Sequence, residues 1–339
     1  MGHEWRKVII MKTRRLGNLE VSEIGMGCMG FSHGYGEIPT EDYAIEAIRK
    51  AHEAGCTFFD TAEIYGPNLS QPGHNELIVG KAIHDFRDDI VLATKFFIAT
   101  DEPKQDGSVL GTITRHIEAS LRRLNTDHVD IYYLHRINPD IPVERIAEAM
   151  STLISEKVIK GWGLSMVNAE LLDRANKVCK VSAVQNIYSM LDRDYEKGVI
   201  PYCMKNNIGF VAFSPTASGY LSGKVNASTK FEGDDVRKWV PQMKPENIKA
   251  NMPLLEVLKT FAERKNATNV QVSLAWMLKK YPCVVPIPGS KNQERILENL
   301  GAADVALTDE EFRELEEAMK GITIHGSRRE VNFPTEYID

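Results

Sequence analysis

Short apolar segments alternate with longer segments of helical periodicity along most of the chain, from about residue 24 onward. This alternation predicts repeated strand–helix units and a parallel sheet. Eight strands are predicted, at residues 24–27, 57–60, 90–95, 129–135, 161–165, 183–185, 209–213 and 284–287. Helical patterns separate them, among others at residues 40–54, 112–124, 143–157, 169–177 and 270–280. Eight such units within 339 residues predict an α/β fold of the (β/α)8 type, a TIM barrel, with a doubly wound sheet as the alternative.

The whole chain, residues 1–339, is predicted to form a single barrel domain, because α/β barrels regularly exceed the usual domain size. Residues before the first strand read as a β-hairpin that turns at residues 16–19 and closes the bottom of the barrel. Three segments stand outside the repeat: an N-terminal extension at 1–10, a long excursion at 215–249, and a C-terminal tail at 321–339. A helical pattern at 254–264 follows the excursion, so extra helices are predicted toward the C-terminus. Long loops such as the excursion often cover or hold a ligand.

Charge and composition exclude several classes of protein. The chain has 41 Lys and Arg against 47 Asp and Glu, and basic residues cluster only in pairs, so nucleic acid is not an expected partner. No apolar run approaches the roughly 18 residues of a membrane helix, and the N-terminus lacks the apolar stretch of a signal peptide. The five cysteines are scattered, without a CxxC pair or the spacing of a zinc site. We therefore expect a cytoplasmic protein with no membrane partner and no bound metal.

A glycine pattern at residues 25–30 matches G-x-G-x-x-G, the fingerprint of dinucleotide-binding Rossmann folds. That fingerprint must open a helix at once. Here residues 31–39 contain Gly34, Gly36 and Pro39, which do not propagate a helix. The pattern is therefore interpreted as a glycine-rich turn after the first strand.

Three polar residues end successive predicted strands: Asp60, Lys95 and His135. Tyr65 follows Asp60 by five residues in the next loop. Each residue taken singly has a structural explanation, as a turn cap, an ion pair or a buried histidine. In a barrel, however, the carboxyl ends of the strands form one rim, and active sites lie there. A carboxylate, an ammonium, an imidazole and a phenol are therefore predicted to converge.

These four side chains suit the protonation of a carbonyl oxygen. A free phenol has a pKa of about 10, and a neighbouring ammonium lowers it, so we expect Lys95 to lower the pKa of Tyr65. Asp60 would keep Lys95 protonated and oriented. His135 would orient the carbonyl oxygen or share in the proton transfer. Since no metal or nucleophile is predicted, hydride from a nicotinamide is the expected attacking group.

Three segments carry a resemblance to a known family: Phe-Asp-Thr-Ala-Glu-Ile-Tyr-Gly at 59–66, Ala-Thr-Lys at 93–95 and Leu-His-Arg at 134–136. In order, spacing and flanking residues they resemble the signature segments of the aldo-keto reductase superfamily. The resemblance runs from about residue 11 to residue 299. It implies a (β/α)8 barrel, NADPH-dependent reduction of aldehydes or ketones, and a catalytic tetrad of Asp60, Tyr65, Lys95 and His135, with Tyr65 as the acid.

The same resemblance implies a cofactor site on the later strand ends. Ser165 and Gln185 match the residues that bind the nicotinamide carboxamide, although Met166 stands where many relatives have asparagine. Phe213 matches an aromatic ring that stacks on the nicotinamide. The segment that follows resembles the loop whose backbone holds the pyrophosphate, with Ser214, Pro215, Gly219, Leu221 and Gly223 as its candidate residues.

The last part of the site is predicted at residues 287–299. Ser290 and Gln293 have the spacing of a capping box, so a helix begins here, and its free amides favour a phosphate. Lys291 and Arg295 supply the charge that a 2′-phosphate needs, which favours NADP(H) over NAD. Some relatives carry lysine where this chain has Gly289. The remaining candidates, for adenine and ribose, are Gln293, Glu298 and Asn299.

Two other functions stay open. A class I aldolase would use Lys95 as a Schiff-base amine, which requires a lowered lysine pKa, whereas Asp60 should raise it. A redox-sensing or regulatory protein would bind NADPH with little turnover. The expected partner is a small carbonyl compound, selected by loops at residues 31–38, 67–74, 96–105, 136–141 and the tail from 321; Trp239 and Tyr337 are candidate pocket residues.

Overall fold

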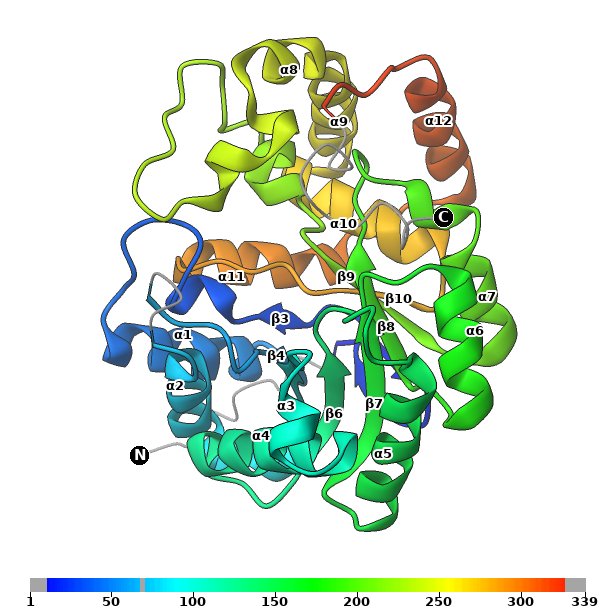
Figure 1. Ribbon diagram of the computed structural model, residues 1–339. Coiled ribbons are helices and arrows are strands. Elements are labelled where there is room, and N and C mark those ends of the chain that lie inside the picture. Colours follow the sequence, from blue (N-terminus) through cyan, green and yellow to red (C-terminus); the bar gives the residue numbers. More distant parts are fainter. Residues whose placement is uncertain (1–10, 68–70, 327–339) are drawn as a thin grey trace, which may run out of the picture.

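In the computed structural model, residues 11–67 and 71–326 are described, so the N-terminal extension and the tail beyond residue 326, with Tyr337, lie outside the described residues. Within them, eight strands form one parallel sheet in chain order (Figure 1). Their bounds are β3 Met26–Gly27, β4 Phe58–Asp60, β5 Val91–Phe96, β6 Val129–Leu134, β7 Ile159–Ser165, β8 Ala183–Ile187, β9 Gly209–Phe213 and β10 Val284–Pro286. All eight predicted strands are confirmed, with ends that differ by at most two residues.

The first and last strands meet, so the sheet closes into a barrel. Gly27 and Gly289 form a parallel bridge, and the amide of Gly25 donates to the carbonyl oxygen of Pro286 at 2.9 Å. A Cβ atom on Gly289 would lie 2.9 Å from the carbonyl oxygen of Gly27, closer than real contacts allow. The close approach of the first and last strands therefore explains why glycine stands at residues 25 and 27 of the glycine pattern. The prediction of a (β/α)8 barrel is confirmed, and the doubly wound alternative is wrong.

A hairpin covers the amino ends of the barrel strands, as predicted. Its strands, β1 Thr13–Leu16 and β2 Leu19–Ser22, pair antiparallel. Leu16 and Val21 are buried against side chains that point into the barrel, including Phe58 and Ile131. The Arg14 guanidinium donates to main-chain carbonyl oxygens at Tyr281 and Val284, at 2.6 and 2.8 Å. The open end of the barrel is therefore the one where the strands terminate.

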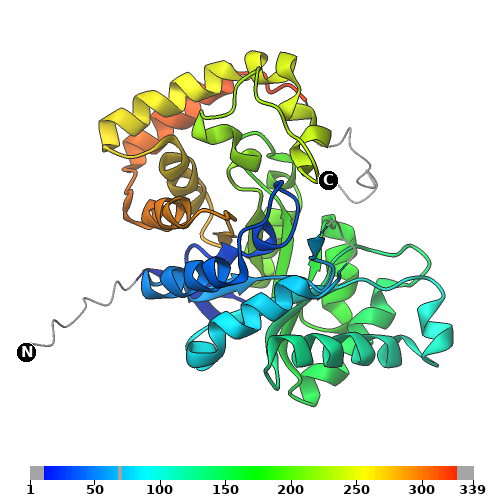
Figure 2. The same cartoon turned by 90° about the vertical axis from the view of Figure 1, so that its left-hand side faces the viewer.

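Helices surround the sheet (Figures 1 and 2). Each long helix buries one apolar stripe; α4, for example, buries Ile113, Ile117 and Leu124 and is capped by Ser108, whose hydroxyl accepts from the amide of Gly111 at 2.9 Å. No helix in the described ranges is long and apolar enough to cross a membrane. The α-helices are α1 Glu41–Glu53, α2 His74–Ile83, α3 Glu102–Gln105, α4 Val109–Leu124, α5 Val143–Ser155, α6 Ala169–Val178, α7 Val199–Asn206, α8 Pro245–Ala250, α9 Met252–Lys265, α10 Asn269–Lys280, α11 Gln293–Leu300 and α12 Asp309–Lys320.

Helices α9 and α12, which stand in addition to the strand–helix repeats, pack against each other. Helix α12 lies along α9, where the ammonium of Lys265 contacts the carboxylate of Glu311 at 2.8 Å (Figure 2). Helix α9 corresponds to the helical pattern predicted at residues 254–264, whereas α12 was expected only in general, as an extra helix toward the C-terminus.

The excursion between β9 and β10 folds into short turns rather than long helices. Its elements are η5 Ala217–Ser222, η6 Val236–Trp239, η7 Pro241–Met243 and α8. It meets the segment after the first strand: the amide of Val236 donates to the carbonyl oxygen of Gly34 at 3.0 Å, and the amide of Gly34 donates to Asp234 at 3.1 Å. Figures 1 and 2 show this dark blue segment beside the yellow-green excursion. Residues 31–38, predicted as a substrate loop, thus join the excursion.

Candidate active site

The structure brings the four predicted catalytic residues together at the open end of the barrel. The Lys95 side chain is fully buried, and its ammonium donates to the Asp60 carboxylate, to the carbonyl oxygen of Thr61 at 2.8 Å and to the Tyr65 hydroxyl at 3.4 Å. The rings of Tyr65 and His135 meet edge to face, with 5.7 Å between centroids. One phenol is therefore in direct contact with both an ammonium and an imidazole.

Strand register places these side chains. Asp60 ends β4, and Lys95 precedes the last residue of β5; His135 directly follows β6, and its amide donates to the carbonyl oxygen of Phe96 at 2.8 Å. Tyr65 lies in the turn after β4, where the amide of Glu63 donates to the carbonyl oxygen of Lys95 at 3.0 Å. Backbone bonds to β5 therefore hold the tyrosine segment next to the lysine.

The Asp60–Lys95 pair keeps its lysine charged. Burial acts to lower the pKa of Lys95, but Asp60 and Tyr65 outweigh it and raise the pKa above its ordinary value. Burial raises the pKa of Asp60, against the opposing effects of Lys95 and of Gln185, whose amide nitrogen donates to the carboxylate at 2.8 Å. A protonated lysine is not a Schiff-base nucleophile, which argues against the aldolase alternative.

The pKa of Tyr65 moves in the opposite direction to the one predicted. Burial raises it above its ordinary value, and the ammonium of Lys95 only offsets part of that rise. The ammonium charge alone would lower the pKa, but desolvation of the phenolate in this buried position has the larger, opposite effect. At neutral pH the phenol is therefore fully protonated, and Lys95 reduces the free-energy cost of losing that proton.

His135 is a neutral imidazole in this setting. Burial lowers its pKa well below the ordinary value, and the nearby charges of Arg136 and Lys95 lower it further. A neutral imidazole carries one N–H donor, so it can orient an oxygen by a hydrogen bond but holds no extra proton to give up. Two roles were predicted for His135, and its lowered pKa favours orienting the carbonyl oxygen over sharing in the proton transfer.

Ser165 and Gln185, the predicted carboxamide contacts, are register partners on neighbouring strands β7 and β8. Both are buried. Arg136, predicted only as part of the signature segment 134–136 and of the substrate loop 136–141, donates from Nη1 to the hydroxyl of Ser165 at 3.1 Å and to the carbonyl oxygen of His135 at 2.6 Å. Its position directly after His135 was the available signal. Arg136 thus links the catalytic rim to the predicted nicotinamide contacts.

Met166 takes a left-handed backbone conformation, with φ of 55°. Asparagine tolerates this region better than methionine does, so the backbone here suits the asparagine that the family resemblance leads us to expect. In this chain the side chain is buried, and the Tyr195 hydroxyl donates to its sulfur at 3.9 Å. Met166 therefore packs in the protein instead of presenting an amide.

The segment after β9 turns sharply. Phe213 is half-buried and ends the strand, Pro215 is buried, and the backbone has positive φ at Ser214 and at residues 217–219. The amides of Gly219, Leu221 and Gly223 donate to carbonyl oxygens of the same loop at 3.0 to 3.2 Å. To bind a pyrophosphate, these three amides would have to give up their hydrogen bonds to the loop's own carbonyl oxygens and donate to the phosphate oxygens instead.

The start of α11 differs from the predicted capping box. Asn292 is the N-cap, and its side chain accepts from the amide of Arg295 at 2.9 Å, whereas the Ser290 hydroxyl accepts from the amide of Asn292. The Gln293 side chain turns to α1 and accepts from Lys50 at 2.9 Å. The capping-box prediction is wrong because asparagine, one residue before the helix, competes for the cap.

The two predicted phosphate-binding cations have different surroundings. The Lys291 ammonium donates to main-chain carbonyl oxygens at Tyr35, at 2.8 Å, and at Glu37. Arg295 is exposed, and its guanidinium has no hydrogen bond or ion pair among the described residues. Asn299 is buried, and its side-chain amide has no hydrogen bond within the described part of the chain. Glu298, on the same helix, is half-buried.

In residues 11–67 and 71–326, no group of three histidine, cysteine or acidic side chains is arranged to hold a metal ion. The five cysteines, all within the described residues, form no disulfide bond.

The fold and this site define a class of protein: a (β/α)8 barrel with a phenol, an ammonium, a carboxylate and an imidazole at the carboxyl ends of its strands. A family model for the aldo/keto reductase family matches residues 23–320. A probable aldo-keto reductase 1 from Glycine max is 34% identical over 313 residues, which are 91% of this chain and 88% of that protein. The chain belongs to the aldo/keto reductase family of oxidoreductases, as its signature segments predicted.

Solved structures agree with this assignment. An aldo/keto reductase from Klebsiella pneumoniae, crystallised with NADP and acetate, is 28% identical with a TM-score of 0.69, and the match covers 93% of this chain and 99% of that one. A glycerol dehydrogenase from Gluconobacter oxydans superposes with a TM-score of 0.81 at 23% identity, over 93% of this chain and 97% of that one, which supports the fold.

Proposed function

We propose that the protein reduces aldehydes or ketones to alcohols with NADPH, and that Tyr65 is the proton donor. The observation that carries this proposal is the contact of the Tyr65 hydroxyl with the buried Lys95 ammonium, beside a neutral His135. Family membership supports the reaction class, and the complex of the Klebsiella relative with NADP supports the cofactor.

The chain's own groups suit the protonation half of the reaction. Bound NADPH would supply hydride to the carbonyl carbon. Tyr65 donates its proton to the carbonyl oxygen, and Lys95 stabilises the negative charge left on the phenolate. His135 holds the oxygen by a hydrogen bond, while Asp60 and the carbonyl oxygen of Thr61 keep the ammonium in place.

Three features of the chain fit NADP(H). Ser165 and Gln185 place polar groups side by side at the rim, where a carboxamide would bind. The Asn299 side-chain amide, which has no hydrogen-bond partner among the described residues, suits a polar edge of adenine. Near it, Lys291 and the exposed Arg295 flank the start of α11, which favours a 2′-phosphate.

Replacing both cations, Lys291→Ala with Arg295→Ala, is expected to raise the Kd for NADPH about 100-fold, because two charge-assisted hydrogen bonds to phosphate are lost. The Kd for NADH should change far less. Titration of cofactor fluorescence measures both constants. The double variant Arg313→Ala with Lys320→Ala, which removes two exposed cations from α12, is the control. An equal loss for NADPH and NADH would contradict the 2′-phosphate site.

The function is tested by NADPH oxidation against a panel of aromatic, aliphatic and quinone carbonyls. We expect NADPH consumption that saturates with at least one class of carbonyl. Tight NADPH binding without consumption across the panel would favour the regulatory alternative instead.

A further inference from the structure

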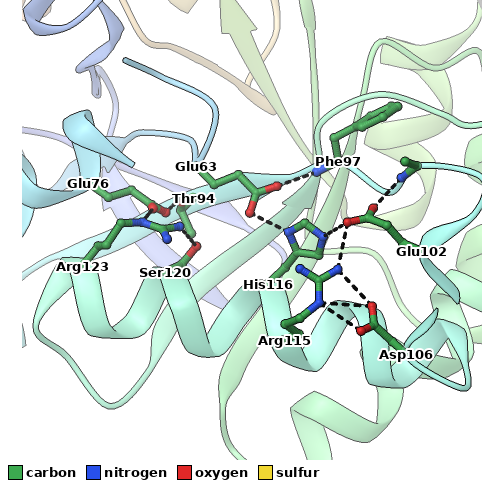
Figure 3. A network of polar contacts seen from close by, with 11 residues as sticks. Glu63, Glu76, Thr94, Phe97, Glu102, Asp106, Arg115, His116, Ser120 and Arg123 are labelled. Atoms are coloured by element: carbon green, nitrogen blue, oxygen red, sulfur yellow. Dashed lines mark hydrogen bonds and ion pairs between the residues drawn. The ribbon is translucent and has the colours of Figure 1, made fainter. Parts of the chain in front are cut away.

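A chain of polar contacts joins the segment that carries Tyr65 to the segment that leaves the lysine strand (Figure 3). Glu63 lies two residues before Tyr65. One carboxylate oxygen of Glu63 accepts from the amide of Phe97 at 3.0 Å, and the other is 2.8 Å from Nδ1 of His116. Phe97 itself lies two residues after Lys95, so this bond ties both catalytic segments to one carboxylate.

The second ring nitrogen of His116 extends the connection. Its Nε2 lies 3.2 Å from a carboxylate oxygen of Glu102, the first residue of α3. The other oxygen of Glu102 accepts from the amide of Ala99 at 2.7 Å. We call Glu63, His116 and Glu102 the histidine bridge. It fixes the amides of Phe97 and Ala99 near the start of the segment 97–106.

Both ring nitrogens of His116 face carboxylates, and this requires an imidazolium. A neutral imidazole has one N–H donor, and ionised carboxylates only accept. In a neutral ring, the nitrogen without a proton would face a carboxylate oxygen, and neither atom could donate a hydrogen bond. Burial acts to raise the pKa of Glu102, but bonds from Ala99, Arg115 and His116 lower it below the ordinary value, so Glu102 is ionised. The imidazolium supplies a donor to each acid.

The surrounding charges favour that protonated form. Burial acts to lower the pKa of His116, and Glu63 and Glu102 outweigh it, so the pKa lies above its ordinary value. Arg115 opposes the protonated form, but its charge is shared with Asp106, which its guanidinium contacts at 2.9 to 3.1 Å. The Phe96 ring lies 6.2 Å from the imidazole between centroids, and the Tyr132 ring stacks on the other ring, that of Phe96. Farther along α4, Arg123 pairs with Glu76 of α2 (Figure 3).

We propose that His116 is a positioning residue for the carbonyl substrate: as an imidazolium it holds the segment 97–106 against the segment that carries Tyr65. The inference rests on the proposed reductase function. Phe97 directly follows the strand of Lys95, and 40% of its surface is exposed. Because the bridge holds the main-chain amide of Phe97, it also sets the position of this aromatic side chain for an entering substrate. His116 touches no reacting group and acts through Glu63 and Glu102.

Two matched variants separate the two halves of the bridge. The amide nitrogen of asparagine stands near the position of Nδ1, and that of glutamine near the position of Nε2. His116→Asn should keep the bond to Glu63 and lose the bond to Glu102, while His116→Gln should do the reverse. His84→Gln is the control, since His84 is exposed and, among the described residues, its side chain forms a hydrogen bond or ion pair only with the neighbouring Asp85.

Amide hydrogen exchange reports on the bridge without any turnover. We expect exchange of the Phe97 amide to speed up about tenfold in His116→Gln, and that of the Ala99 amide to speed up in His116→Asn, as a charge-assisted bond is lost. In the unaltered protein, both amides should lose protection as pH rises through the raised pKa of His116, because the imidazolium is then lost. Unchanged exchange in both variants would overturn the bridge.

Kinetics test what the bridge does. In His116→Gln, the KM for a carbonyl should rise about five- to tenfold with kcat and the Kd for NADPH little changed, because the variant disturbs substrate placement and no proposed cofactor contact. The carbonyl KM of the unaltered protein should rise with pH, whereas that of His116→Gln should stay flat. If the unaltered protein reduces carbonyls and the variants share its KM and pH profile, the positioning role is wrong while the reductase function stands. If no carbonyl is reduced at all, the reductase function fails and the substrate role of His116 fails with it, whatever exchange shows of the bridge.

Discussion

Tyr65→Phe is expected to lower kcat for carbonyl reduction about 1,000-fold, within the range that a positioned general acid contributes. The substitution removes the hydroxyl that contacts Lys95 and leaves the ring that packs against His135. The Kd for NADPH should stay near that of the unaltered protein, because Tyr65 is not among the proposed cofactor contacts. Stopped-flow measurement of NADPH oxidation and a fluorescence titration give the two values.

Tyr202→Phe is the matched control, because it also removes one phenolic hydroxyl, from a site between α6 and α7 where it bonds to Asp173. It should leave kcat unchanged. If Tyr65→Phe kept most of the activity, Tyr65 would not be the acid.

Lys95→Met is the second substitution with a large expected effect. It leaves the buried carboxylate of Asp60 without its ammonium, and breaking a buried ion pair in this way costs about 3–5 kcal/mol of folding free energy. It should also lower kcat about 100-fold or more, because the charge that stabilises the phenolate is gone. Urea unfolding and NADPH oxidation measure the two effects.

The unfolding free energy of Lys95→Met should depend on pH in a direction that the pKa of Asp60 determines. Burial already raises the pKa of Asp60, and without Lys95 it should rise further, above its value in the unfolded chain. The unfolding free energy of Lys95→Met should therefore increase as pH falls through that raised pKa and the carboxylate is neutralised. The double variant Lys95→Met with Asp60→Asn should recover stability but not activity. Recovery of activity as well would mean that the charge of Lys95 is not required.

The barrel and the rim residues could be predicted because they depend on local pattern. Each buried strand is a short apolar run, and a polar residue at or near its end marks the carboxyl edge of the sheet. Asp60 is the last residue of β4, and Lys95 is the residue before the last in β5. Parallel register then brings those ends together without any knowledge of the loops.

The features that escaped prediction depend on distant contacts. The net direction of the Tyr65 pKa follows from burial, which a sequence does not state. The contact of Arg136 with Ser165 joins the residues after β6 to the end of β7. The histidine bridge joins residues 63, 102 and 116, which lie in the turn after β4, in α3 and in α4. The cap at Asn292 depends on where the chain turns after the barrel seam, and the spacing of Ser290 and Gln293 alone pointed elsewhere.

Transfer of deuterium from labelled NADPH tests the central claim most directly. The protein would be incubated with NADPH carrying deuterium in the transferable position of the nicotinamide and with a carbonyl that the panel identifies. We predict one alcohol formed per NADPH consumed, with deuterium on the carbon that bore the carbonyl oxygen. NADPH that binds and stays unconsumed, or alcohol without the label, would contradict the account.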